Sequence, residues 1–180
     1  IRSLRENVMA IHDSLQKSTL VAHSLSIDQN TSLEDASNLA RANHVDFLAV
    51  SDGGRIIGLC PAIEINMCLS ARFGHAIYAG RPITQFMIKD PVIIHESTPM
   101  REIMSLVFGR EKNSFYDDIL LLDKDHSLIG LIQTETLIRL QHQILKEELR
   151  KSDEQRESLG RKNLELAQLA GKLESANRMM

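Results

Sequence analysis

The residue types that could hold a metal are two cysteines and a nearby histidine. Cys60 and Cys68 are the only cysteines of the chain, and His75 follows the second. Zinc ligands usually come in pairs about two to four residues apart, and these residues are spaced more widely. We therefore expect no metal site. The cysteines fall about two turns apart in one predicted helix, too far to bridge, so we expect buried thiols in a reducing cytosol.

His142 and the acidic pair Asp117–Asp118 are the next candidates for chemistry. The phospho-accepting histidine of a sensor kinase is usually followed by an acidic residue and a nearby proline, but Gln143 follows His142, and no proline occurs after Pro99. We interpret His142 as part of a helical seam and the acidic pair as a turn and edge feature. No phosphate-binding glycine loop and no Ser-His-Asp motif is present. The sequence therefore predicts that the chain is not an enzyme.

Composition narrows the class of protein. The 180 residues carry 25% charged side chains and a net charge of −3, so no general attraction to nucleic acid or to an anionic membrane is implied. No run approaches the ~20 apolar residues of a membrane span, and no secretory signal opens the chain. Hydrophobic content is 43% and aromatic content 4%, so the core must be aliphatic. We expect a cytoplasmic protein with one compact domain and an extended element.

The first segment has the pattern of a helix with one apolar face. Leu4, Val8, Ile11 and Leu15 recur at helical spacing between residues 2 and 18. This helix could be the tail of an upstream linker. The chain begins at Ile1 and its last stretch has helical sequence, so we expect a piece of a longer protein.

An internal repeat determines the predicted fold. In its first copy, Thr31 to Glu34 form a capping box, Asp52-Gly53 predicts a hairpin turn, and Pro61 opens a helix. The copy therefore reads strand, helix, strand, strand, helix. These elements are expected at 26–27, from 31, at 47–50, at 55–60 and from 61.

The second copy repeats the same order. Ser97-Thr98-Pro99 cap and start its first helix, and Thr134 begins its last. The strands are expected at 92–94, 118–122 and 127–133, with a turn at 124–126.

Aligning the copies pairs Thr31 with Thr98 and Gly58 with Gly130, after an insertion near 110–114. One copy cannot bury both faces of its small sheet, whereas two copies packed sheet to sheet can. We therefore predict an α/β fold in which the copies are related by a pseudo-two-fold axis. The expected segments are an N-terminal linker at 1–19, the copies at 20–80 and 81–137, and a coiled coil at 138–180.

The strand-turn-strand segments resemble the CBS-domain family. Residues 47–59 read FLAVSDGGRIIGL, and residues 118–132 read DILLLDKDHSLIGLI. The family pattern is an apolar strand, an acidic turn, and a strand that ends in glycine and apolar residues. The resemblance spans 21–143 and implies a tandem CBS pair, or Bateman module. The connection at 73–82, FGHAIYAGRP, is similar to linkers of CBS pairs beside diguanylate cyclase and phosphodiesterase domains, which implies bacterial signalling.

Many CBS pairs bind adenine nucleotides in the cleft between the copies, and the resemblance implies where such a site would lie. The family's signature begins at the strand glycine, places Ser or Thr near phosphate, and places Asp on the ribose. In the first copy it begins at Gly58, but Pro61 takes the hydroxyl position and has no donor. Glu64 takes the Asp position and could still reach a ribose.

The second copy departs further from the signature. It begins at Gly130, and Gln133 and Thr136 occupy the hydroxyl and Asp positions. The open alternatives are weak binding of an adenine nucleotide, another small ligand, or a cleft filled by side chains or water. No cofactor is certain. The cleft residues implied are Ile27, Pro61, Glu64, Gln133 and Thr136.

The segment after Thr134 has the heptad pattern of a coiled coil. Leucine at d with occasional asparagine at a is typical of a parallel dimer. Gly160 and Gly171, each costing up to ~1 kcal/mol, predict a marginal coil, and a single solvated helix is the alternative. The d positions are Ile138, Leu145, Ser152, Leu159, Leu166, Leu173 and Met180, and the a positions include Leu149, Asn163 and Asn177.

Taken together, these patterns predict a homodimeric regulatory module. It would sense a small ligand, or relay the state of a partner, to an output domain beyond Met180, for which a diguanylate cyclase or a histidine kinase is expected. The alternative is a ligand-free dimerisation scaffold.

Overall fold

The structure is a computed structural model that describes residues 17–177, with side chains described to residue 172. The helix expected over 2–18 lies almost wholly outside the described residues, and Lys17–Leu20 form a 3₁₀ turn, η1. The described residues divide into two units, one ending at Ile138 and one beginning at Arg139.

The first copy builds a three-stranded sheet from β1 (Ser26–Asp28), β2 (Phe47–Asp52) and β3 (Arg55–Pro61). The strand order is β1-β2-β3, with β1 parallel to β2 and β2 antiparallel to β3. Helix α2 (Leu33–Asn43) connects β1 to β2, and α3 (Ala62–Ser70) follows β3 directly. The predicted hairpin turn is confirmed, with Gly53 and Gly54 both at positive φ, which glycine adopts readily.

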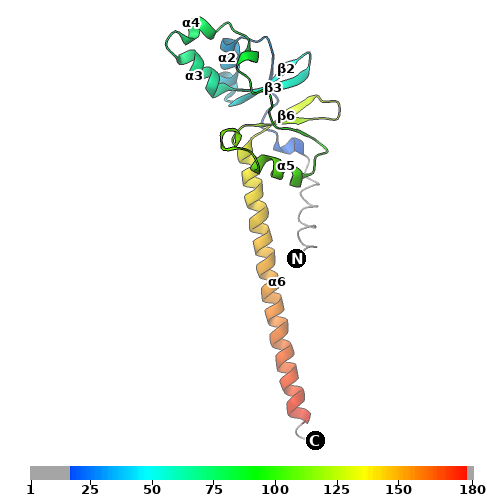
Figure 1. The fold of residues 1–180 in the computed structure, drawn as a ribbon. Coiled ribbons are helices and arrows are strands. Elements are labelled where there is room, and N and C mark those ends of the chain that lie inside the picture. Colours follow the sequence, from blue (N-terminus) through cyan, green and yellow to red (C-terminus); the bar gives the residue numbers. More distant parts are fainter. Residues whose placement is uncertain (1–16, 178–180) are drawn as a thin grey trace. The chain divides into compact units, whose positions relative to one another are not determined.

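The second copy repeats this topology. Its strands are β4 (Ile93–His95), β5 (Ile119–Leu122) and β6 (Leu128–Ile132), again with a parallel first pair and an antiparallel second pair. Helix α5 (Met100–Phe108) connects β4 to β5, and α6 (Thr134–Asn177) follows β6 (Figure 1). The predicted order of strand, helix, strand, strand, helix is thus confirmed in both copies. Between the copies lie α4 (Gly74–Tyr78) and the 3₁₀ turn η2 (Ile83–Gln85).

The two glycines that the alignment paired occupy matching places. Gly58 lies opposite Val50 and Gly130 opposite Leu121, and in both hairpins the register shifts at the next residue. A Cβ on Gly58 would lie 2.8 Å from the Ile88 carbonyl oxygen, and one on Gly130 would lie 2.7 Å from that of His23. Glycine is needed at both places because another backbone approaches there.

These approaching backbones join the copies reciprocally. Ile88, on the segment that leads into β4, bridges to Leu59 of β3, with N–O distances of 3.0 and 2.8 Å. His23, on the segment that leads into β1, bridges to Leu131 of β6, whose amide donates to the His23 carbonyl at 2.8 Å. The leading segment of each copy, just before its first strand, therefore pairs with the last strand of the other copy, as a pseudo-two-fold relation requires.

The core follows from strand alternation. Successive side chains point to opposite faces, so Leu48 and Val50 pack with α2 and α3, while Ala49 faces the second copy. Both faces of each sheet are buried, which explains why β2 and β5 read as continuous apolar runs. The cluster between the sheets consists of Ala49, Ile56, Leu59, Leu120, Leu122 and Leu131. The core is aliphatic, as the composition predicted.

The predicted helix starts need correction. The α2 cap is Ser32, whose Oγ accepts from the Asp35 amide at 3.1 Å, so the box lies one residue later than Thr31 to Glu34. The Glu34 amide is occupied elsewhere, because it donates to the Ala79 carbonyl at 3.1 Å.

A second correction concerns α5. Pro99 is its N-cap residue and provides no side-chain hydrogen bond. The Thr98 hydroxyl instead accepts from the His95 amide at 3.1 Å, which stabilises the turn before the helix. Pro61 stands at the corresponding place before α3, at the end of β3, as its N-cap.

Candidate functional site

Ile27 contributes its side chain to the core of the first copy. It is buried there with Leu33, Leu48 and Ile65. Its backbone carbonyl accepts from the Ser51 hydroxyl at 3.2 Å. A ligand at this position would therefore meet the strand backbone rather than the Ile27 side chain.

Pro61 and Glu64 lie where β3 passes into α3. Pro61 is buried and offers no donor, whereas Glu64 is exposed in the first turn of α3, where the helix dipole favours a carboxylate. Burial, and secondarily the charge of Glu64, raise the pKa of Cys60 to about 12. The Cys60 thiol therefore stays protonated and unreactive at neutral pH.

Gln133 and Thr136 lie at the corresponding passage from β6 into α6. Both are half-buried, and the Thr136 amide donates to the Gln133 carbonyl at 3.0 Å. The buried hydroxyl at this place belongs to Thr134, which is 2% exposed. Its Oγ1 donates to the Asp117 carbonyl at 3.0 Å, so this hydroxyl is already engaged within the protein.

Arg110 is the residue that organises this end of the second copy. Its guanidinium donates to the carbonyls of Asp117 and Phe115 at 2.8 and 2.9 Å and to the Thr134 hydroxyl at 2.6 Å. Burial lowers the pKa of Arg110, although Asp117 and Asp118 oppose that effect. Sequence reasoning missed this role, and its only signal was the insertion near 110–114 that the first copy lacks.

Asp118 is buried, which corrects its interpretation as an edge feature. It is 4% exposed and leads into β5, the central strand of its sheet, and its Oδ2 has no hydrogen-bond partner in the described part of the chain. Burial raises the pKa of Asp118 to about 7, with further contributions from Asp46 and Asp117 and an opposing one from Arg110. Asp46 directly precedes β2 in the first copy, so a carboxylate of the first copy contributes to the raised pKa of a carboxyl in the second.

His23 is the second orphaned polar group near the junction of the copies. Its Nδ1 accepts from the Leu25 amide at 3.2 Å, while its buried Nε2 has no partner among the described residues. Burial lowers the pKa of His23, so the ring is neutral at pH 7. Within residues 17–177, no three His, Cys, Asp or Glu side chains are grouped so as to hold a metal ion.

The second copy matches a known family at the sequence level. Residues 83–142 match the family model of the CBS domain. No curated protein matches the chain. The family match thus covers the copy that contains Gly130, and the first copy is related to it through its topology.

Solved structures match both copies. A CBS domain-containing protein of unknown function from Bacillus anthracis superposes with a TM-score of 0.61 at 13% identity, covering 74% of this chain and 97% of that one. CBSX2, a CBS-pair protein from Arabidopsis thaliana, superposes with a TM-score of 0.58 at 18% identity, covering 73% and 96%. CBSX2 in complex with AMP superposes with a TM-score of 0.55 at 19% identity, covering 73% of this chain and 98% of that one. At these identities the likeness establishes the fold.

Proposed function

We propose that this chain, which contains a CBS-domain pair and a long C-terminal helix, is a regulatory module that senses a small ligand and controls a signalling domain. The observation that carries the proposal is the reciprocal exchange of leading segments between the copies. This exchange makes the relative position of the two sheets depend on His23 and Ile88, which flank the place where the copies meet. A ligand that binds better to one arrangement of the sheets would shift the population toward it.

The ligand class we propose is an adenine nucleotide bound weakly. CBSX2, of similar fold, is known in complex with AMP, and Glu64 stands exposed where the ribose-binding acid of the family is expected. Pro61 has no hydroxyl, and Thr136 is no carboxylate. Two lost hydrogen bonds to charged groups, at about 1.5–3 kcal/mol each, weaken affinity by about a hundredfold or more. We therefore expect no micromolar affinity for AMP, ADP or ATP.

Calorimetry and an NMR titration with AMP test this proposal. Weak, saturable binding is expected, and Glu64→Gln should remove it. Glu102→Gln is the matched control, because Glu102 is likewise exposed in a first turn, that of α5. Micromolar binding of AMP, or equal shifts in the Glu64 variant, would contradict the assignment. If no nucleotide raises the melting temperature even at millimolar concentration, the ligand-free scaffold is the correct function.

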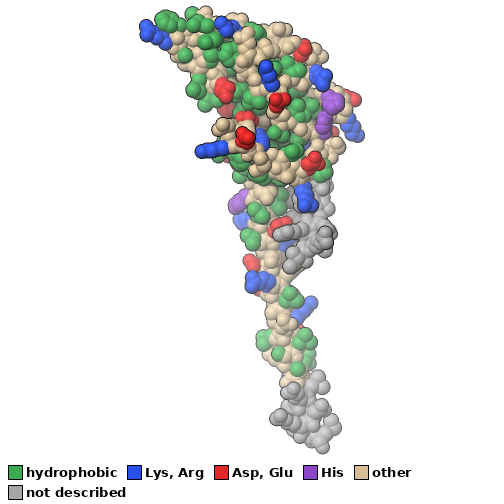
Figure 2. Space-filling model, viewed as in Figure 1, with side chains coloured by type: hydrophobic (Ala, Val, Ile, Leu, Met, Phe, Trp, Pro, Cys, Tyr) green, Lys and Arg blue, Asp and Glu red, His purple; other side chains and the backbone are tan. Residues whose placement is uncertain are grey.

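A homodimer is the second part of the proposed function. Helices α3 and α4 and the N-cap residue of α4 expose four large apolar side chains, and Figure 2 shows hydrophobic side chains gathered over this region. They are Ile63, Met67, Phe73 and Ile77. Exposed apolar patches of this kind mark interaction surfaces. All four belong to the first copy or the segment after it, which favours a head-to-head dimer with each first copy beside its mate's.

Helix α6 supplies a second dimer surface. Leu145, Leu149, Leu159 and Leu166 are exposed on it, as seam residues of an unpartnered coil would be. Ion pairs along this helix join Glu147, Arg150, Lys151 and Glu154, which fall at b, c and f positions outside the a/d seam. We propose that a parallel pair of these helices transmits the state of the CBS pair to an output domain, a diguanylate cyclase or histidine kinase, in a longer chain.

None of the helices within residues 17–177 is both long and apolar enough to cross a membrane.

A further inference from the structure

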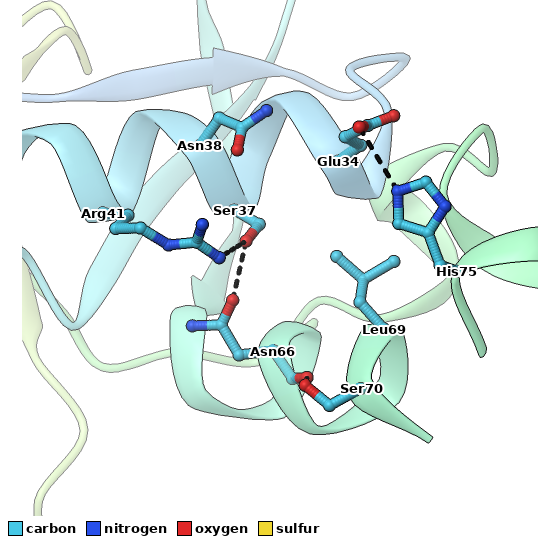
Figure 3. Close-up of a pocket in the computed structure, with 8 residues that line it drawn as sticks. All are labelled: Glu34, Ser37, Asn38, Arg41, Asn66, Leu69, Ser70 and His75. Carbon is cyan, nitrogen blue, oxygen red and sulfur yellow. Dashed lines mark hydrogen bonds and ion pairs between the residues drawn. The ribbon is translucent and has the colours of Figure 1, made fainter. Parts of the chain in front are cut away.

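A polar hollow of about 310 Å³ lies on the helical side of the first copy, away from the junction of the sheets (Figure 3). Helices α2 and α3 form its walls, and His75 of α4 closes one end. Its volume falls at the lower end of the range of small-molecule sites, about 300–1,000 Å³. Neither the proposed nucleotide site nor the apolar surface of α3 and α4 accounts for it.

One end of the hollow collects hydrogen-bond donors. The guanidinium of Arg41 makes a single long hydrogen bond, from Nη2 to the Ser37 hydroxyl at 3.5 Å, and no ion pair with a described residue. Ser37 is 2% exposed, and its hydroxyl donates to Asn66 Oδ1 at 2.6 Å, which leaves the amide nitrogen of Asn66 on the side of Arg41 (Figure 3). A charged fork and an amide donor converging in this way suit an oxyanion.

The remainder of the hollow suits hydroxyl groups. Glu34 and His75 form its other end, joined at 3.3 Å between Oε1 and Nε2. Glu34 and Arg41 are two turns apart on α2, so the ends are about 10 Å apart along the helix. Leu69 is the one apolar side chain among the described residues that line the hollow. A nucleobase would lack an apolar slot here, whereas a hydroxylated molecule finds donors and acceptors along its whole length.

We propose that this hollow binds a small hydroxylated oxyanion, such as a sugar phosphate or a sugar acid. Its oxyanion contacts Arg41 and Asn66, and its hydroxyl groups extend toward Glu34 and His75. The site is separate from the one at the junction of the copies, so its failure would leave the proposed nucleotide sensing untouched.

Calorimetric titration of the whole chain with glucose 6-phosphate and with gluconate tests the proposal, with glucose and inorganic phosphate as reference probes. We expect saturable binding of at least one of the first two, tighter than that of either reference. Arg41→Gln should weaken it about tenfold or more through loss of a charge-assisted contact, and Arg41→Lys, which keeps the charge and loses the fork, should weaken it less. Arg55→Gln, at the exposed arginine that begins β3, should bind as wild type does.

Several results would overturn the proposal. One is the absence of saturable binding of both hydroxylated probes up to about 20 mM. Another is unchanged binding in Arg41→Gln. If inorganic phosphate binds as tightly as glucose 6-phosphate, the hydroxyl contacts are refuted. If Arg41→Gln alters the dimer dissociation constant and not probe binding, a second copy of the chain covers the hollow instead. Circular dichroism of each variant verifies that it is folded.

Discussion

At the scale of single residues, the start of α6 is held by one arginine. Arg110 binds two carbonyls of the loop before β5 and the hydroxyl of Thr134, which in turn binds the Asp117 carbonyl. Because backbone carbonyls buried without donors are costly, this arrangement ties the α5–β5 loop to the first turn of α6. Next to Asp117 in the chain, Asp118 has a raised pKa because its carboxyl is buried.

Thr134→Val should destabilise the protein by about 1–3 kcal/mol. The change removes the hydroxyl that accepts a hydrogen bond from Arg110 and donates one to the Asp117 carbonyl. Thr136→Val, two residues along the same turn and half-buried, should cost less than 0.5 kcal/mol, about the size of a surface change. Urea denaturation at pH 7 measures both. Equal costs for the two variants would show that the Arg110 arrangement contributes no stability.

The raised pKa of Asp118 predicts a pH dependence of stability. Between the unfolded value of 3.8 and the folded value of about 7, the folded state holds a proton that the unfolded state has released. Stability should therefore fall as pH rises from about 4 to 7 and level off above. One pKa unit corresponds to 1.36 kcal/mol, so the loss of stability is on the order of 4 kcal/mol.

The variant Asp118→Asn should not show this loss, and its advantage over wild type should grow from pH 4 to pH 8. Asp125→Asn, at an exposed carboxyl of the β5–β6 turn, should follow the wild-type curve. Denaturant unfolding at several pH values measures the three curves. Parallel curves for wild type and Asp118→Asn would show that Asp118 is ionised with an ordinary pKa.

At the scale of elements, α3 exposes two large apolar side chains more fully than α4 or α5 exposes any. Ile63 and Met67, one turn apart, are 68% and 70% exposed, while Ile65 on the opposite side is fully buried. A helix that is apolar on both sides is normally covered on both sides. The outer side of α3 is therefore the part of the first copy where a mate is expected.

Met67→Glu should weaken the dimer about tenfold or more, because it buries a carboxylate in an apolar interface. Tyr116→Glu is the matched control, since Tyr116 is equally exposed, at 74%, but lies in the loop before β5. Sedimentation velocity across a concentration series gives both dissociation constants. A dimer unaffected by Met67→Glu but disrupted by Tyr116→Glu would move the interface to the second copy.

At the scale of the whole molecule, duplication solves a burial problem. A three-stranded sheet with helices on one face leaves its other face to water, and the second copy covers that face. The same duplication creates a junction where, among the described residues, Nε2 of His23 and Oδ2 of Asp118 are buried without a hydrogen-bond partner. A regulatory module needs such a place, where the packing of two halves can respond to a ligand or a proton.

The proposed parallel dimer predicts a disulfide between copies. In a Cys60→Ala, Cys68→Ala background, Leu166→Cys should crosslink efficiently under mild oxidation, because d residues of a parallel coil face each other in register. Glu165→Cys, one residue away and outside the a/d seam, should crosslink poorly. Non-reducing gels measure both. Absence of the 166 crosslink in a protein that remains dimeric would refute the parallel coil and, with it, the head-to-head arrangement.

The sequence by itself determined the repeat, the order of elements and the position of the strand glycines. These are local or duplicated signals: apolar runs at 47–50 and 119–122, turns between them, and a glycine wherever two backbones must approach. Only the tertiary structure decided the rest. The α2 cap lies one residue later than predicted because the Glu34 amide donates its hydrogen bond to the carbonyl of Ala79, which is distant in the sequence. The burial of Asp118, the partners of Arg110 and the polar hollow likewise depend on which distant segments meet, and residue types and spacing do not encode those distances.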